Sequence, residues 1–247
     1  MNRAARPRNL LQRVLALYDT SPRAERFFVR ARSSLSDLAA LERHAPRTGA
    51  ILDIGCGHGL VSNLLALGGP GRDVTGIDIA EAKVAAARRT IGARANIRFL
   101  VADATTFVGG PYAAITIADV LYLLPPELRG RLLASCARML APDGVLIWKS
   151  QVRERSVKYA VTFGQEWLMT NLGPTEGHGL YFPTAAESLA DVRNAGLQAI
   201  ALPMPSWRPY TDVLFLGYKP HGANEGHGGM NDQDSGMARA GDDAGAV

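Results

Sequence analysis

Short apolar runs alternate with amphipathic segments through the middle of this chain. The segments at about 58–68, 80–91 and 126–140 have the periodicity of helices. The alternation predicts a doubly wound α/β fold, with a mostly parallel sheet, helices on both faces, and a ligand crevice at the carboxyl ends of the strands. Five apolar runs are typical of buried strands, at residues 49–53, 72–78, 96–104, 113–119 and 144–149.

Residues 1–47 predict a helical extension in front of the first strand. Apolar residues between 10 and 18 fall on one side of an amphipathic helix. A second helix is expected from Ser21-Pro22 to about His44, because serine is a frequent N-cap and proline fits the first helical position. We expect both helices to cover the sheet edge as a lid over the ligand site.

The chain after the fifth apolar run predicts an insertion and the end of the domain. Thr184-Ala185-Ala186-Glu187 is a capping box, so a new helix begins there and residues 151–183 before it are an insertion. The domain itself is expected to span residues 48–219. Its last elements are a helix at 184–195 and strands near 197–203 and 211–218.

Residues 220–247 differ in composition from the rest of the chain. They are rich in Gly, Asp, Asn and Ala and almost free of large apolar side chains. Such a segment cannot bury enough surface to offset its ordering entropy, so we expect a disordered tail. His221 and His227 could bind a metal, but no further ligands follow at useful spacing, and we expect no metal site.

A glycine-rich turn, Asp53-Ile54-Gly55-Cys56-Gly57-His58-Gly59, follows the first apolar run. Glycine lets the backbone turn tightly and lets a ligand lie against it. A dinucleotide fingerprint spaces its glycines G-x-G-x-x-G, and here Leu60 occupies the third glycine position. The acid before the first glycine would repel a pyrophosphate, but it suits the ammonium and sulfonium of S-adenosylmethionine (SAM). The turn therefore favours SAM over NAD.

Three more apolar runs end in an acid, namely Asp78, Asp103 and Asp119. Because the carboxyl ends of parallel strands lie along one edge, these acids and Asp53 are expected to gather at the crevice. An acid at the end of the second strand can accept hydrogen bonds from both ribose hydroxyls, which is the role we expect for Asp78.

Between about residues 48 and 218 the chain resembles the class I SAM-dependent methyltransferases. The glycine turn, Asp78, Asp103-Ala104 and the sequence D-V-L-Y-L-L-P from Asp119 are similar to that family's motifs, in the same order. The resemblance implies SAM as cofactor and a seven-stranded sheet whose last strand is antiparallel. The SAM-binding residues that it implies are Asp53, Gly55, Cys56, Gly57, Gly59, Asp78, Ile79, Asp103, Ala104 and Asp119.

The insertion lies where this family commonly places its substrate cover. Tyr159, Phe163 and Trp167 recur every four residues, and with Tyr181 they would form an apolar wall for the methyl acceptor. Ordinary core packing is the alternative for this aromatic stripe.

His178 is the first candidate for a general base, because histidine can accept a proton near neutral pH. Tyr122, Glu166 and Tyr181 are weaker candidates. A dedicated base can also be absent, since alignment of acceptor, methyl group and sulfur lowers much of the barrier.

These observations predict a SAM-dependent methyltransferase that acts on a small or lipid-like, hydrophobic acceptor by in-line displacement. The alternatives are an NAD(P)-dependent oxidoreductase, an RNA methyltransferase and a non-catalytic SAM-fold adaptor. The fourth run ends in Asp119-Val120-Leu121-Tyr122 rather than in N-P-P-[FYW], which argues against methylation of exocyclic amines in nucleic acids.

Composition agrees with a cytoplasmic enzyme of one core. The chain has 247 residues, 47% of them hydrophobic, and its two cysteines, Cys56 and Cys136, provide no disulfide framework. No apolar run approaches the roughly 18 residues that span a bilayer, and Gln12-Arg13 interrupts any signal-peptide core. The net charge is +4, and eight arginines against two acids fall within residues 1–32. We expect these arginines to be solvated; weak contact with an anionic membrane surface is the alternative.

Overall fold

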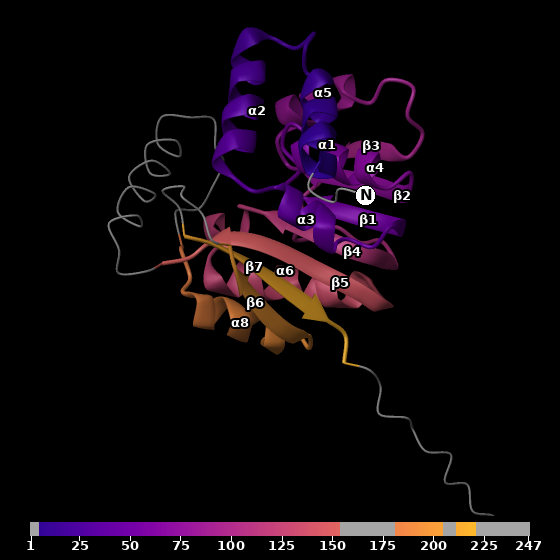
Figure 1. Ribbon diagram of the computed structural model, residues 1–247. Coiled ribbons are helices and arrows are strands. Elements are labelled where there is room, and N and C mark those ends of the chain that lie inside the picture. The colour runs from indigo at the N-terminus through magenta and orange to yellow at the C-terminus, as the bar shows by residue number, and fades with distance from the viewer. Residues whose placement is uncertain (1–4, 154–180, 205–210, 221–247) are drawn as a thin grey trace, which may run out of the picture.

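The computed structural model describes residues 5–153, 181–204 and 211–220, and a seven-stranded sheet forms its centre (Figure 1). The strand order is β3-β2-β1-β4-β5-β7-β6. Strands β1 to β5 pair in parallel, whereas β7 is antiparallel to both of its neighbours. The α/β prediction with an antiparallel last strand is confirmed. The strands are β1 (Thr48–Ile54), β2 (Gly71–Asp78), β3 (Ile97–Val101), β4 (Tyr112–Ala118), β5 (Leu140–Gln151), β6 (Gln198–Pro203) and β7 (Asp212–Tyr218).

Helices cover both faces of the sheet (Figure 1). Adjacent strand residues point to opposite faces, so Ile51 belongs to one hydrophobic cluster and Leu52 to the other. The first cluster includes side chains of α1 to α5, and the second includes those of α6 and α8. The helices are α1 (Ala5–Ala16), α2 (Arg23–Leu35), α3 (Ala39–His44), α4 (Leu60–Gly68), α5 (Glu81–Arg89), the 3-10 helix η1 (Leu121–Leu123), α6 (Pro126–Met139) and α8 (Ala185–Asn194).

The amino-terminal extension contains a break that the sequence did not predict. A single helix to His44 was expected, but α2 ends at Leu35 and Ser36 has extended backbone angles (φ −132°, ψ 134°). The hydroxyls of Ser33 and Ser34 both donate to the Arg30 carbonyl oxygen. Serine side chains compete for helical backbone groups in this way, so the run Ser33-Ser34 weakens the end of the helix. The break lets α2 and α3 pack separately.

A buried guanidinium fastens α3 to the amino-terminal end of β2. The Arg72 side chain is fully buried, and such a charge is tolerated only where its donors are satisfied. Its partners are Glu42 Oε1 at 3.1 Å and the carbonyl oxygens of Leu65 (2.8 Å), Ala45 (3.0 Å) and Pro46 (2.6 Å).

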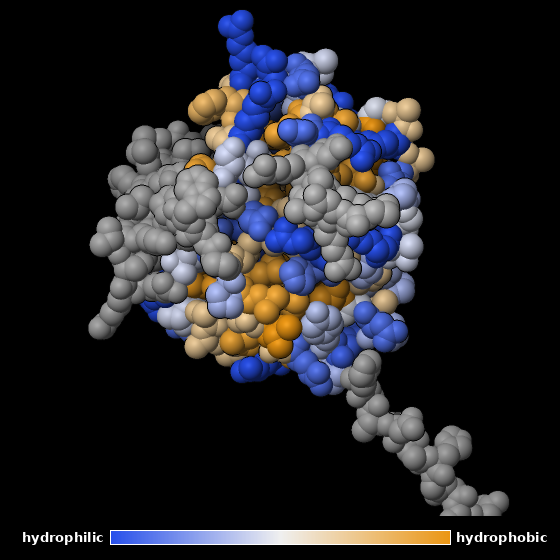
Figure 2. All heavy atoms as spheres, in the orientation of Figure 1, coloured by the Kyte–Doolittle hydropathy of each residue, from blue (hydrophilic) through white to orange (hydrophobic). Residues whose placement is uncertain are grey.

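Strand β5 is longer than the apolar run at 144–149 predicted. It extends to Gln151 because β7 pairs with it from Val145 to that residue. Strand β6 forms the sheet edge, where Figure 2 shows apolar residues, and Ile200 is 49% exposed.

Several predictions lie outside the described residues. They concern most of the insertion, with Tyr159, Phe163, Trp167, Glu166 and His178, and nearly all of the expected tail. Among the helices that the structure describes, none has the length and apolar character needed to cross a bilayer.

Candidate active site

A cavity of about 760 Å³ opens at the carboxyl ends of the parallel strands, with α2 as one wall. This volume is in the range of small-molecule sites. Nine of the ten residues that the sequence assigns to SAM line it, and so does Tyr122. Gly59 and Tyr181 do not line it. The sequence therefore placed these residues around one cavity, because the strands that carry Asp53, Asp78 and Asp119 near their carboxyl ends are parallel and end at the same edge of the sheet.

The three glycines of the turn after β1 have different surroundings. Gly55, Gly57 and Gly59 all have positive φ, at 69°, 52° and 82°. A Cβ at Gly55 would collide with Val120, and one at Gly59 would come within 2.7 Å of Phe99 Cζ. A Cβ at Gly57 would meet no atom within 4 Å. Gly57 therefore faces open cavity, whereas Gly59 permits close packing of α4 on the sheet.

Asp78, at the end of β2, holds the glycine turn in place. Its Oδ2 accepts from the Gly57 amide at 2.8 Å, and its Oδ1 accepts from the Ala80 amide at 2.9 Å. A carboxylate oxygen has two lone pairs, so each can accept one more hydrogen bond from a ligand. The Asp78 carboxylate therefore holds the turn and can still accept hydrogen bonds from a ligand in the cavity.

Asp53 is turned into the protein. Its Oδ2 accepts from Ser62 Oγ at 2.5 Å and its Oδ1 from Thr116 Oγ1 at 2.8 Å, and the residue is 1% exposed. Burial raises the pKa of this carboxyl to about 6, although both hydroxyls lower it. Asp53 can thus act on a cation in the cavity through its charge.

Asp103 follows β3, at the other end of the parallel strands from β5. We call this part of the cavity the rim. Its Oδ1 accepts from the amide and the hydroxyl of Thr105, both at 2.8 Å, which fixes the loop after β3. Asp103 is exposed and Ala104 is half-buried. Ile79 lines the same rim and is 57% exposed, an uncommon position for isoleucine unless a ligand covers it.

Four charged side chains meet where β4, β5 and β7 approach α2. Lys149 Nζ lies 2.9 Å from Asp119 Oδ1 and 3.0 Å from Asp212 Oδ1. Arg32 of α2 reaches Asp119 Oδ2 at 3.2 Å. We call these four residues the charged cluster, and all of them line the cavity.

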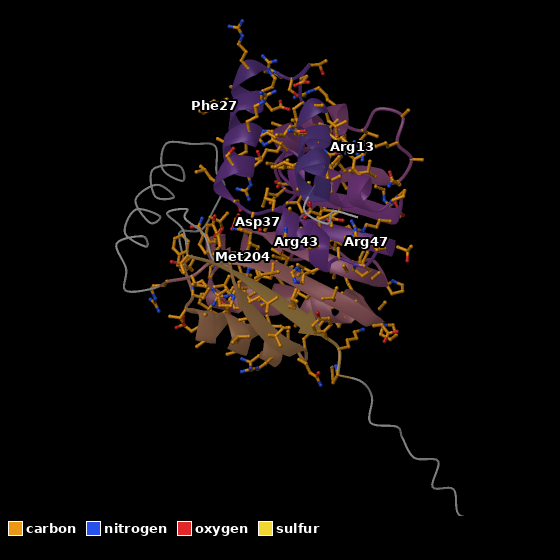
Figure 3. All side chains as sticks on the ribbon, viewed as in Figure 1. Arg13, Phe27, Asp37, Arg43, Arg47 and Met204 are labelled. Atoms are coloured by element: carbon orange, nitrogen blue, oxygen red, sulfur yellow. The ribbon has the colours of Figure 1, made fainter. Side chains whose placement is uncertain are left out.

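Helix α2 covers the cavity with an apolar side. Phe27, Phe28 and Leu35 line it and are 75%, 39% and 37% exposed. Figure 3 shows Phe27 pointing away from the body of the protein, and Figure 2 shows hydrophilic residues where α2 begins. The helix is therefore amphipathic at the mouth of the cavity.

Contacts between the extension and the glycine turn converge on His58. The Tyr18 hydroxyl donates to the His58 carbonyl oxygen at 2.9 Å, and the Phe28 ring lies 5.1 Å from the imidazole. Burial lowers the pKa of His58, which keeps the imidazole neutral. His58 is part of the cavity wall.

Tyr122 and Tyr181 are held together. The Tyr181 amide donates to the Tyr122 carbonyl oxygen at 2.7 Å, and the Tyr122 ring stacks on Phe182 with centroids 4.7 Å apart. Tyr122 is buried and lines the cavity, whereas Tyr181 is partly exposed beside it.

Cys56 lines the cavity, but burial raises the pKa of its thiol well above the ordinary value. A thiol of this kind stays protonated and is a poor nucleophile. Within the described ranges, no group of three or more His, Cys, Asp or Glu residues is placed to hold a metal ion.

The cavity fits SAM in shape and charge. Gly57 leaves space for a ligand against the backbone, as a cradle that a Cβ would partly fill. Among the residues that the structure describes, five lining acids against three lining bases leave an excess of two negative charges, which suits a ligand of net positive charge. The acids are Asp53, Asp78, Asp103, Asp119 and Asp212, and the bases are Arg32, Lys83 and Lys149.

The chain is similar in sequence to known methyltransferases. Residues 51–144 match the family described as "Methyltransferase domain". The ubiquinone biosynthesis O-methyltransferase of Xanthomonas axonopodis pv. citri is 31% identical over 189 residues, which cover 71% of this chain and 77% of that protein.

Two solved structures share the fold. Mitomycin 7-O-methyltransferase superposes with a TM-score of 0.62 at 19% identity, over 83% of this chain but only 60% of that longer chain. Magnesium protoporphyrin IX methyltransferase from Synechocystis PCC 6803, solved with bound S-adenosylhomocysteine (SAH), superposes with a TM-score of 0.60 at 22% identity, over 86% and 94% of the two chains. The chain belongs to the class I SAM-dependent methyltransferases. It is a methyltransferase, and SAM is its cofactor.

Sequence reasoning missed the charged cluster beyond Asp119 and the individual α2 residues of the wall. Lys149 carried a signal, because it is a charged residue at the end of the apolar run Gly144–Trp148. Arg32 and Asp212 carried none, since only the folded chain brings them to that lysine.

Proposed function

We propose that this methyltransferase transfers the methyl group of SAM to a hydroxyl oxygen of a small, hydrophobic, ring-bearing or lipid-like acceptor by in-line displacement. The observation that carries the proposal is that two kinds of residues line one cavity. We call the lining acids and the glycine turn the polar half, and we call the side chains of Phe27, Phe28, Leu35, Tyr122 and Leu124 the apolar half. The Xanthomonas relative is an O-methyltransferase by name, which supports oxygen as the atom methylated.

The polar half is suited to SAM. Asp78 is proposed to accept hydrogen bonds from the ribose hydroxyls, with Gly55, Cys56 and Gly57 along the methionine part. Asp103, Ala104 and Ile79 at the rim are proposed to hold the adenine. Asp53 contributes its buried charge, and Gly59 permits the packing that positions the turn. SAM supplies an activated methyl group when bound.

The apolar half is suited to the acceptor. Its walls are Phe27, Phe28 and Leu35 from α2, and Tyr122 with Leu124 after β4. Aromatic and aliphatic walls favour a ring or an alkyl chain over a sugar or a polynucleotide. Tyr159, Phe163, Trp167 and Tyr181 of the insertion are proposed to complete this cover, and His178 and Tyr122 remain candidates for a proton acceptor.

The amino-terminal extension is proposed to bring a lipid-like acceptor to the mouth of the cavity. Phe27 is exposed there, and Arg23, Arg26 and Arg30 lie on the same helix. An exposed apolar side chain among arginines suits weak contact with an anionic membrane surface.

The proposal is tested with a panel of phenols, alkyl alcohols, amines and sugars as methyl acceptors. Release of SAH measures methyl transfer to each of them. We expect turnover with phenols or lipid alcohols and none with sugars. Leu35→Ala should raise the apparent KM for the acceptor and leave SAM affinity unchanged. Leu100→Ala is the matched control, because Leu100 is 38% exposed, close to the 37% of Leu35, and does not line the cavity. Equal kinetic effects of both substitutions would contradict an acceptor wall on α2.

A further inference from the structure

The charged cluster joins four elements that are far apart in sequence. Lys149 Nζ donates to both carboxylate oxygens of Asp119, at 2.9 and 3.2 Å, and forms an ion pair with Asp212 at 3.0 Å. From α2, Arg32 donates to Asp119 Oδ2 and, at 3.4 Å, to the Ala118 carbonyl oxygen. Asp119, which follows β4, is therefore the residue that connects β5 and α2.

Burial of these charges is costly for a purely structural contact. The side chains of Lys149, Asp212 and Asp119 are only 1%, 3% and 5% exposed. Apolar residues of similar volume often stabilise a fold as well as a buried ion pair does. Asp119 also has a φ of +58°, in the left-handed region that non-glycine residues seldom adopt. Asp119 is thus a buried charge with a backbone conformation uncommon outside glycine, and it lies beside a ligand cavity. This combination points to a functional role.

Asp119 is placed between the two halves of the cavity. The next residue, Val120, packs against Gly55 of the turn, so Asp119 adjoins the SAM half. The 3-10 helix η1 follows at once and carries Tyr122 of the apolar half. An acceptor atom that meets the methyl group must lie near this boundary.

We propose that Asp119 is a catalytic residue that receives the proton of the acceptor hydroxyl, and that Lys149 is a positioning residue for its carboxylate. This proposal rests on the proposed O-methyl transfer. As the oxygen–carbon bond forms, the carbon–sulfur bond breaks and its electron pair stays on sulfur. The hydroxyl proton passes to Asp119. The sulfonium becomes a neutral thioether and the carboxylate a neutral acid, so charge and atoms balance.

The other members of the cluster explain how the carboxylate is held. Lys149 compensates the negative charges of Asp119 and Asp212, which would otherwise repel each other. Arg32 contacts Asp119 Oδ2 at 3.2 Å, and because its side chain is 35% exposed, this contact can yield to an acceptor hydroxyl. Among the described residues, Asp119 pairs with Lys149 from β5 and Arg32 from α2, Asp212 from β7 shares Lys149, and Asp53 of β1 lines the same cavity.

The test compares two phenols of different acidity, catechol and the more acidic 4-nitrocatechol, with the full chain and SAM. Asp119→Asn keeps the size of the side chain but removes its basicity. Turnover with catechol should fall by about 10²-fold or more, as for loss of a general base. The loss should be smaller with 4-nitrocatechol and should shrink as pH rises, because an ionised hydroxyl needs no base. Lys149→Met should show the same pattern, and Lys149→Arg should restore part of the activity.

Calorimetry with SAM and SAH supplies a readout independent of turnover. Affinity should stay within about threefold of wild type in Asp119→Asn. Asp73→Asn is the matched control, because that exposed acid pairs only with Arg98 among the described residues and should change neither measurement. A tenfold loss of SAM affinity would overturn the proposal in favour of the SAM-binding role that the sequence implies for Asp119. Wild-type turnover in Asp119→Asn, or an equal loss with both phenols at every pH, would also overturn it. A wild-type protein that binds SAM and methylates neither phenol would contradict the proposed acceptor class, and this proposal with it.

Discussion

Substitution of Asp78 should weaken SAM binding by about two orders of magnitude. Asp78→Ala removes the hydrogen bonds to the Gly57 and Ala80 amides, at 2.8 and 2.9 Å, and with them the proposed ribose contacts. The two ribose hydrogen bonds proposed for the Asp78 carboxylate, at about 1.5 kcal/mol each, sum to about 3 kcal/mol. That energy corresponds to roughly a hundredfold change in Kd. The Gly57 and Ala80 amide bonds order the turn even without ligand. Part of the free energy lost in the variant will therefore appear as reduced stability of the protein rather than as weaker SAM binding. Even half of it leaves about a tenfold effect on affinity.

Calorimetry with SAM, SAH and NAD measures this effect directly, and thermal unfolding without ligand measures the part that appears as stability. Asp73→Ala is the control, since Asp73 lies on the same strand and pairs with Arg98 at the surface. We expect no NAD binding by wild type or variants. A change in SAM affinity of less than threefold in Asp78→Ala, with an intact fold, would refute the role of this carboxylate.

Three further predictions follow from other parts of the structure. Arg72→Met should lower the free energy of unfolding by about 3 kcal/mol or more, because the Glu42 carboxylate and several carbonyl groups lose their buried partner. Chemical denaturation measures this change, and an unchanged midpoint of unfolding would contradict the prediction. The pKa of Asp53 is raised from 3.8 to about 6 by burial, so the folded state binds the proton more tightly and this group's contribution to stability should fall as pH rises from about 4 to 6. The stability difference between Asp53→Asn and wild type should therefore change within that window and stay constant above it, as measured by denaturation at each pH. Phe27→Glu should reduce flotation with anionic vesicles, whereas Val108→Glu, at a residue 86% exposed and outside the cavity, should not; equal flotation of both variants would argue against membrane contact through α2.

The sequence by itself determined the order of strands and helices, the glycine turn and the position of the site. These features depend on local causes. Hydrophobic periodicity marks each element, glycine allows positive φ at Gly55 and Gly57, and parallel strands must end at one edge. Asp53, Asp78, Asp103 and Asp119 consequently gather around one cavity, as predicted. The assignments within the insertion stay predictions.

The tertiary structure alone decided what each of these residues contacts. Asp53 and Asp78 both lie near the ends of their strands, yet Ser62 and Thr116 hold the first inside the protein, while the second holds the turn and lines the cavity. The break after Leu35 and the cluster of Arg32, Asp119, Lys149 and Asp212 were likewise absent from local patterns. The contacts within this cluster join residues 30 to more than 80 positions apart, and their geometry is set by the packing of whole elements. The sequence therefore predicted that the acids gather at one cavity, and the packing of α2, β5 and β7 determined which charged side chains meet at Lys149 and Asp119.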